Sequence, residues 1–272
     1  FHMANGSDGW AGTASLIART TDGGQHWQTA TAAQCPSSPT TTIASAFALD
    51  ATDLWFVCAH GTMIGSQTFT LYRTGDGGQT WQSTALSIPQ AQFIEGLTFV
   101  DALHGWFTNN EGAATGHHFL VLYRTTDGGA TWQEATRTDG PGGLESGGLG
   151  MGPVFLNAVT GWFGDGSSDF NNMPDQFVLR VTHDGGTTWS QQSLPPPHGS
   201  VFGTTIPPIF FDSQHGTLLF SVILAPRSAT SNQETVHYQT SNGGQTWVPQ
   251  PLIPLALMNF AFSDAQHGWA VL

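Results

Sequence analysis

The sequence predicts an all-β repeat protein, and three observations lead to this fold class. An eight-residue signature, Thr-x-(Asp/Asn)-Gly-Gly-x-x-Trp, occurs five times, beginning at Thr20, Thr74, Thr125, Thr182 and Thr240. Its acidic positions recur every 51 to 58 residues, which is typical of a repeat array. Between the signatures lie short runs of aromatic and branched residues bounded by Gly, Asn and Asp, which read as strands, and no stretch has helical periodicity.

A second signature runs in phase with the first and ends in Gly-Trp or a close variant. Its copies end at Trp10, Trp55, Trp106, Trp162, Thr217 and Trp269. Each repeat unit therefore carries two fixed turns, which we call the box turn (first signature) and the Gly-Trp turn (second signature). One unit is too small to bury its own core, so we expect the units to stack.

Each unit reads as four antiparallel strands. In the third unit the expected strands are Phe93 to Val100, Gly105 to Thr108, His118 to Thr125 and Thr131 to Glu134. Four-stranded sheets repeated around an axis make a β-propeller, whose radial packing removes long exposed edges. The two fixed turns join strands across the same end of a sheet, which we call the box end, and the remaining connections lie at the other end, the loop end.

The box turn has a physical rationale. Its two glycines supply positive φ, its acid accepts backbone N–H groups of its own turn, and its tryptophan is expected to fill the gap between neighbouring sheets. Asn242 keeps one acceptor oxygen, so the fifth copy should form as well. We assign a structural role to Asp22, Asp76, Asp127, Asp184, Asn242, Trp27, Trp81, Trp132, Trp189 and Trp247. The alternative is that the five positions are catalytic or metal-binding. Five copies at the end of the sheets where the turns hardly vary in length fit a structural role better.

The loop end is where the units differ in length. The connections Asp139 to Pro153 and Ser221 to Glu234 are long, and insertions that collect on one face of a repeat protein usually mark its binding face. The candidate binding residues in these loops are Glu111, Asp139, Glu145, Asp165, Asp169, Asp175, Arg227 and Glu234.

The box signature is that of the Asp-box, or BNR repeat, of sialidases, sortilin-type receptors and several glycosidases. Its combination with the Gly-Trp turn, FVDALHGW followed by LYRTTDGGATW, resembles the photosystem II stability and assembly factor family and its relatives in non-photosynthetic bacteria. The resemblance covers essentially the whole chain. It implies a non-enzymatic binding propeller, extracellular, periplasmic or at the cell surface, that assists the assembly of other proteins.

The composition favours a partner other than that of the photosynthetic members, which are expected to use a basic patch. The chain has no lysine and six cationic residues in all, and Arg19, Arg73 and Arg124 occupy one repeat position. The remaining arginines, Arg137, Arg180 and Arg227, do not predict a patch. We expect a protein or glycan partner and no cofactor.

An enzyme remains the alternative, as a glycoside hydrolase or lyase of the Asp-box propeller type. A sialidase needs a unique tyrosine nucleophile and an arginine cluster, whereas Tyr72, Tyr123 and Tyr238 share one repeat position. Other glycosidases need two carboxylates roughly 5 to 10 Å apart, and the loop acids could supply such a pair. All ten tryptophans fall on the two repeat positions, which leaves none for a sugar-stacking platform.

Metal binding is not the main expectation. Asp165, Asp169 and Asp175 offer the oxygen ligands that calcium prefers, but their spacing is not that of an EF-hand loop. His104, His215 and His267 each precede the glycine of a Gly-Trp turn, which favours a turn-stabilising role over a metal role.

The two cysteines are predicted to lie at the same end of the second sheet. Cys35 falls in the connection that enters that sheet and Cys58 near the end of its second strand. A disulfide between them would imply an oxidising compartment; free buried thiols are the alternative.

Length and charge limit the remaining possibilities. The 272 residues carry a net charge of −13, which disfavours nucleic acid, since phosphates require Lys and Arg. No apolar run reaches the roughly 18 residues that a membrane span needs. We expect residues 1–272 to form a single propeller domain of about five units and the start of a sixth. The first ten residues align with Phe260 to Trp269, so we expect a piece of a longer polypeptide that closes at six or seven blades.

Overall fold

The structure is a computed structural model of residues 1–272 and describes most of the chain. The described residues are 2–4, 6–13, 16–35, 41–61, 67–89, 93–114, 117–138, 140–144, 152–164, 177–195, 200–203, 205–224, 233–254, 259–262, 264 and 267–271. Within these ranges all regular structure is β-strand, and none of it offers a helix that could cross a membrane.

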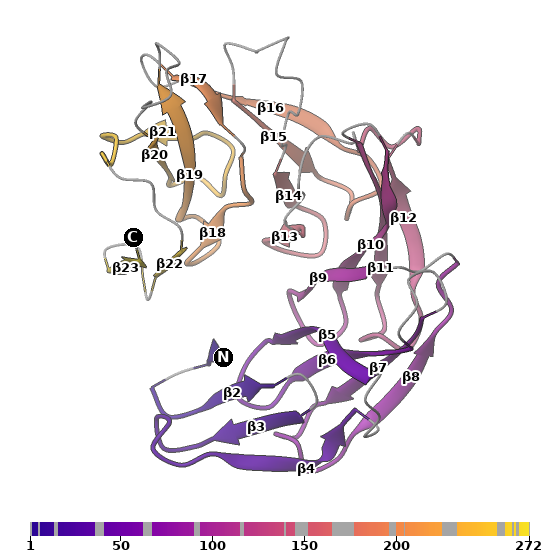
Figure 1. The fold of residues 1–272 in the computed structure, drawn as a ribbon. Coiled ribbons are helices and arrows are strands. Elements are labelled where there is room, and N and C mark those ends of the chain that lie inside the picture. Colours follow the sequence, from indigo (N-terminus) through magenta and orange to yellow (C-terminus); the bar gives the residue numbers. More distant parts are fainter. Residues whose placement is uncertain are drawn as a thin grey trace. The chain divides into compact units, whose positions relative to one another are not determined.

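The chain divides into two compact units, described here separately: residues 1–112 with 119–137, and residues 113–118 with 138–272. The first unit holds three four-stranded antiparallel sheets, in which each strand pairs with the next in the chain (Figure 1). Sheet 1 consists of β1 (His2–Met3), β2 (Gly9–Gly12), β3 (Leu16–Thr20) and β4 (Gln28–Gln34). Sheet 2 consists of β5 (Thr41–Ala48), β6 (Leu54–His60), β7 (Thr68–Thr74) and β8 (Gln82–Leu86). Sheet 3 consists of β9 (Phe93–Phe99), β10 (Gly105–Ala114), β11 (His117–Thr125) and β12 (Gln133–Arg137).

The second unit contains a four-stranded sheet, a five-stranded sheet in which β17 and β18 both pair with β19, and a two-stranded sheet. Sheet 4 consists of β13 (Val154–Phe155), β14 (Gly161–Gly164), β15 (Phe177–Thr182) and β16 (Ser190–Leu194). Sheet 5 consists of β17 (Ser200–Gly203), β18 (Ile209–Phe210), β19 (Gly216–Leu224), β20 (Gln233–Thr240) and β21 (Val248–Pro249). The strands β22 (Asn259–Phe262) and β23 (Gly268–Val271) form a two-stranded sheet. The predicted all-β class of four-stranded antiparallel sheets is confirmed, while the number of blades stays a prediction.

Several strand boundaries differ from the sequence-based expectation. In sheet 3, β10 continues to Ala114 instead of ending at Thr108, and β12 covers Gln133–Arg137 instead of Thr131 to Glu134. In sheet 5, the expected loop Ser221 to Glu234 is wrong at both ends, because Val222 pairs with Glu234 and Ile223 with Gln233. Branched residues such as Val222 and Ile223 favour β-strands. Both ends of the expected loop therefore belong to the strands β19 and β20.

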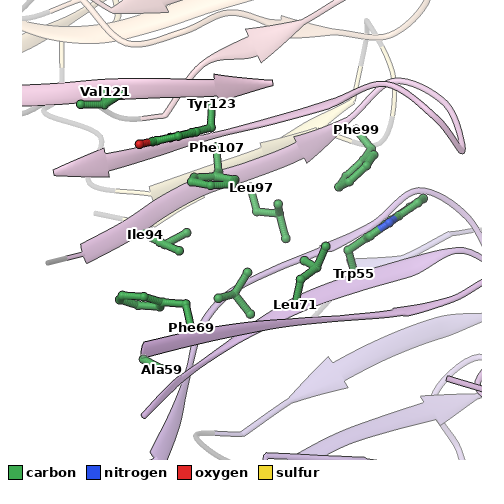
Figure 2. Close-up of a cluster of buried hydrophobic side chains, with 11 residues drawn as sticks. Trp55, Ala59, Phe69, Leu71, Ile94, Leu97, Phe99, Phe107, Val121 and Tyr123 are labelled. Carbon is green, nitrogen blue, oxygen red and sulfur yellow. The ribbon is translucent and has the colours of Figure 1, made fainter. Parts of the chain in front are cut away.

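The largest core of the first unit lies between sheets 2 and 3. Figure 2 shows Trp55, Phe69 and Leu71 of sheet 2 pointing toward Ile94, Leu97 and Phe99 of sheet 3. The rings of Trp55 and Phe99 stack with their centroids 3.9 Å apart. Burial of each large apolar side chain contributes about 1.5–3 kcal/mol, so the sheets depend on one another for stability.

Two other clusters occupy the equivalent positions. Sheets 1 and 2 share a smaller core around Trp10, Ile17, Leu54 and Phe56. Sheets 4 and 5 share a core that includes Trp162, Leu179, Phe220 and Tyr238. Neighbouring sheets thus share a buried core in both compact units, as expected for repeats that are too small to bury a core alone.

Candidate functional site

The box turn uses every oxygen of its acid. In sheet 3, Thr125 Oγ1 donates a hydrogen bond to Asp127 Oδ1 (2.8 Å) and accepts one from the Gly129 N–H (2.9 Å). The Thr131 N–H donates to Asp127 Oδ1 (2.9 Å), and Thr131 Oγ1 donates to Asp127 Oδ2 (2.6 Å). The carboxylate therefore fixes the turn that carries it, as expected for a structural role.

The other copies keep this arrangement with small substitutions. Asp76 and Asp184 are held by Thr80 and Thr188 as Asp127 is held by Thr131. In the fifth copy the Thr246 N–H donates to Asn242 Oδ1 (3.0 Å), while Asn242 Nδ2 donates to Thr246 Oγ1 (2.8 Å). The amide thus reverses one hydrogen bond and preserves the turn.

The two fixed turns of each sheet are bonded to each other. Both glycines of every box have positive φ, and the N–H of the first one donates to a carbonyl of the Gly-Trp turn at 2.8 to 3.0 Å. The donor and acceptor pairs are Gly23 and Ser7, Gly77 and Thr52, Gly128 and Leu103, Gly185 and Val159, and Gly243 and Gln214. Both turns therefore lie at one end of the sheet, as the sequence predicted.

These bonds lower the pKa of the box carboxyl groups. Hydrogen bonds from the Thr80 hydroxyl and the Thr80 N–H lower the pKa of Asp76 to about 2. The His26 N–H and then the His26 ring lower the pKa of Asp22 to about 2. Hydrogen bonds to the charged form of a carboxyl favour ionisation. A general acid at neutral pH needs the opposite shift.

The tryptophans of both turns lie beside the cores between sheets. The box tryptophans Trp81 and Trp132 pack against the clusters shared by sheets 1 and 2 and by sheets 2 and 3, and Trp247 belongs to the cluster shared by sheets 4 and 5. The tryptophan of the Gly-Trp turn also reaches the next sheet: Trp55 Nε1 donates to the Gly128 carbonyl (2.9 Å).

An arginine completes this contact, and we call the combination the inter-sheet clamp. Arg73 lies over the Trp55 ring at 5.1 Å, 3.6 Å from Asp53, and its guanidinium occupies the space that a side chain at Gly128 would need. Arg19 repeats the arrangement between sheets 1 and 2, where its Nη1 donates to the Gly77 carbonyl (3.2 Å) and its Nη2 to Asp8 (3.1 Å). These two arginines are part of the scaffold.

Sheets 4 and 5 use a different residue for the same purpose. Val181 stands three residues before Asp184, where the earlier copies have arginine. Gln192 takes over: its Oε1 accepts from Trp162 Nε1 (3.1 Å), and its Nε2 donates to the Gly244 carbonyl (2.8 Å). The sequence analysis did not identify Gln192. The replacement of the repeat arginine by Val181 was the sequence feature that could have indicated a substitute contact.

The structure brings one predicted loop acid into a polar cluster. Glu111 lies on β10, and its Oε2 is 3.8 Å from Nη1 of Arg137. The Arg137 guanidinium also forms a two-pronged ion pair with Glu134, at 2.7 and 2.8 Å. Burial, then the charges of Glu134 and Glu111, raise the pKa of the neighbouring Tyr123. Arg137 is therefore held between two carboxylates.

Of the other candidates, Glu234 lies among the described residues, on β20 opposite Val222. The remaining predicted residues, Asp139, Glu145, Asp165, Asp169, Asp175 and Arg227, lie outside the described residues, and so does the calcium candidate. In the part of the chain that the structure describes, no three or more His, Cys, Asp or Glu side chains are arranged to hold a metal ion.

The histidines and cysteines take structural positions. His104 Nδ1 lies 2.8 Å from Asp101 Oδ2 within its own Gly-Trp turn, and His215 and His267 repeat this contact with Asp212 and Asp264. Cys35 and Cys58 form a disulfide between the end of sheet 1 and strand β6.

The loop end of sheet 3 exposes two aromatic rings. Phe93, the first residue of β9, is 43% exposed, and Phe119, near the start of β11, is 38% exposed. Both strands run from the loop end toward the box end, so the rings lie at the end opposite the box turn. Exposed aromatic side chains are favourable anchors for a binding partner.

Comparisons with known proteins agree with this description. The BNR/Asp-box repeat model matches residues 123–134, so the chain carries an Asp-box. No curated protein sequence matches the chain. Among solved structures, YCF48 bound to a D1 peptide is 15% identical, with 99% of this chain and 88% of that chain covered and a TM-score of 0.51.

Two glycoside hydrolases share the fold as well. The GH74 xyloglucanase from Xanthomonas campestris is 15% identical with a TM-score of 0.54, and the likeness covers 99% of this chain and 49% of the xyloglucanase. This chain thus spans about half the length of that enzyme. An α-L-arabinofuranosidase from Fusarium graminearum is 11% identical with a TM-score of 0.50, covering 76% of this chain and 65% of that one. At these identities the likeness shows the β-propeller fold, which binding proteins and hydrolases share.

Proposed function

We propose that this Asp-box propeller is a non-enzymatic binding or assembly protein that recognises a partner through the loop end of its sheets. The observation that carries the proposal is the use of the four box acids and Asn242 within their own turns, with Asp127 held by Thr125 and Thr131 as the example. Acids whose oxygens are all bonded within their own turns do not supply catalysis. We therefore assign the box end a structural role and the loop end the binding role.

The partner class is a protein or a glycan, and we favour a protein. Phe93 and Phe119 offer apolar contact area at the loop end of sheet 3. A propeller of this fold, YCF48, has been solved with a D1 peptide bound. The net charge of −13 favours a partner that is not itself strongly acidic.

We place the protein in an extracellular, periplasmic or cell-surface location. The Cys35–Cys58 disulfide supports this, since structural disulfides persist in oxidising compartments and are rare in reducing ones.

The experiment compares matched variants at the two ends of sheet 3. Phe93→Ser with Phe119→Ser removes the exposed rings of the loop end, and Leu103→Ser removes a side chain that is 51% exposed at the box end. Each protein is used to select ligands from a peptide display library and on a glycan array. We expect the loop-end variant to lose the ligands that the wild type selects and the Leu103→Ser variant to keep them.

A hydrolase assay tests the alternative function, that of a glycoside hydrolase. The wild type is incubated with xyloglucan and arabinan oligosaccharides, and the release of reducing ends is measured. Cleavage that persists after purification to homogeneity would contradict the proposal, and so would ligand binding that depends on Leu103 instead of the loop-end rings.

A further inference from the structure

Among the described residues, the buried cluster between sheets 1 and 2 has seven members, two of which are Cys35 and Cys58. The clusters between sheets 2 and 3 and between sheets 4 and 5 have eleven described members each. Apolar burial stabilises in proportion to area, so the two half-cystines are a substantial part of the described core between sheets 1 and 2.

Sheet 1 contacts sheet 2 through side-chain hydrogen bonds at the box end and through a disulfide at the loop end. At the box end, Arg19 donates to the Gly77 carbonyl and Trp10 Nε1 donates to the Asp50 carbonyl (3.0 Å). At the loop end, Cys35 directly follows β4, and Cys58 lies on β6 opposite Ile43 and Thr70. At this end, which the inter-sheet clamp does not reach, the disulfide adds a second covalent link to the chain connection between β4 and β5.

We propose that the Cys35–Cys58 disulfide is a redox-sensitive clasp that keeps the loop end of sheet 1 closed against sheet 2. Reduction by a dithiol breaks the Cys35–Cys58 bond and forms a disulfide in the dithiol, so that two electrons and two protons pass to the two cysteine thiols. Sheet 1 then separates from sheet 2 beginning at the loop end, and the hydrogen bonds of Arg19 and Trp10 at the box end oppose this opening. This device does not depend on what the propeller binds.

Burial of the sulfur atoms couples reduction to opening. Cys35 is 2% exposed and Cys58 is fully buried. Thiol–disulfide exchange requires access of the attacking thiolate to a sulfur, so a dithiol reaches the bond only when sheet 1 separates locally from sheet 2. The rate of reduction under native conditions thus reports the local opening, which is a sub-global unfolding event.

The first test follows amide hydrogen exchange of the wild-type protein before and after reduction with dithiothreitol. We expect protection to fall in β2, β3 and β4, and to be retained in β6, β7 and β10. Unchanged protection in sheet 1 would overturn the proposal. An equal loss in all three sheets would overturn it too, because the disulfide would then be a global stabiliser.

The second test uses the two inter-sheet clamps as a matched pair. Arg19→Ala weakens the attachment of sheet 1 to sheet 2, and Arg73→Ala weakens the equivalent attachment of sheet 2 to sheet 3. We expect Arg19→Ala to accelerate reduction by about fivefold, the effect of one lost hydrogen bond on a local opening equilibrium, and Arg73→Ala to leave the rate unchanged. Equal acceleration by both variants, or by neither, is the contrary result.

Discussion

Trp55 Nε1 donates a 2.9 Å hydrogen bond to the carbonyl oxygen of Gly128, so the Gly-Trp turn of sheet 2 holds the box turn of sheet 3. The indole also stacks on Phe99. The Arg73 guanidinium lies over the Trp55 ring, 5.1 Å from its centroid. One fully buried side chain thus joins the polar and the apolar contacts between two repeats. Each repeat is therefore stabilised by its neighbour as well as by its own hairpins.

Substitution of Trp55 by Phe is expected to destabilise the protein. The variant loses the hydrogen bond to Gly128, leaves that carbonyl buried without its donor, and removes part of the stack on Phe99. We expect a loss of about 2–3 kcal/mol in the free energy of unfolding, measured by urea denaturation. Trp269→Phe is the matched control, because Trp269 has the same repeat position and is 66% exposed. Equal losses in the two variants would show that the contact to the next sheet has no part in stability.

Gly128 is expected to resist substitution for two reasons. It has a φ of 72°, and a Cβ atom there would collide with the Arg73 guanidinium and the Ala102 carbonyl. Gly128→Ala should therefore cost the left-handed backbone strain of about 1–2 kcal/mol and more from the displaced clamp. Gly75→Ala is the control, since a Cβ atom at Gly75 meets only ordinary contact with Asp53 at 3.5 Å. Thermal unfolding of both variants would detect the difference, and similar melting temperatures would refute this account of the box glycine.

The sequence predicted the fold because each turn carries its own chemistry. Two adjacent glycines and an acid or amide determine a box turn locally, so the motif itself indicated the turns that Asp76 and Asn242 form. Contacts between repeats were harder to predict, because the residue that makes them changes from one interface to the next. Arg73 and Gln192 perform one role from different strands, and no local pattern connects them.

The candidate site was predicted less well than the fold, for a related reason. A charged residue in a loop takes its neighbours from distant strands. Arg137, which the sequence left without a partner, lies between Glu134 on its own strand and Glu111 on β10. The pairing of Glu111 and Arg137 depends on how far β10 extends beyond Thr108, which alternation of residue types did not indicate.

Gln192 provides a test of the substitute contact in the second unit. Gln192→Ala removes the acceptor for Trp162 within sheet 4 and the donor to the Gly244 carbonyl of sheet 5. We expect a loss of about 1–2 kcal/mol, because buried partners are left unsatisfied. Gln214→Ala is the control, as the Gln214 side chain donates only to the adjacent Ser213 carbonyl and is exposed. Denaturant midpoints that coincide for the two variants would show that Gln192 does not join the sheets.

The pH dependence of stability follows from the lowered pKa values of the turn acids. Hydrogen bonds hold the pKa of Asp22, Asp76 and Asp212 at about 2, against 3.8 for an unperturbed carboxyl. Between these values the unfolded chain binds more protons than the folded one, so stability rises with pH through this window. The contribution of these acids is fully present above about pH 4 and is lost as the pH falls toward 2.

Asp76→Asn isolates one of these groups. An amide keeps the turn, as Asn242 does with Thr246, but it does not titrate. We therefore expect nearly wild-type stability at pH 7 and a shallower loss between pH 4 and pH 2, measured by urea denaturation across that range. Glu95→Gln, which replaces an exposed carboxylate on β9, serves as the control and should leave the acid-induced loss unchanged. If Asp76→Asn instead reduced stability equally at all pH values, the Asp76 carboxylate would be acting through its shape and not through its charge.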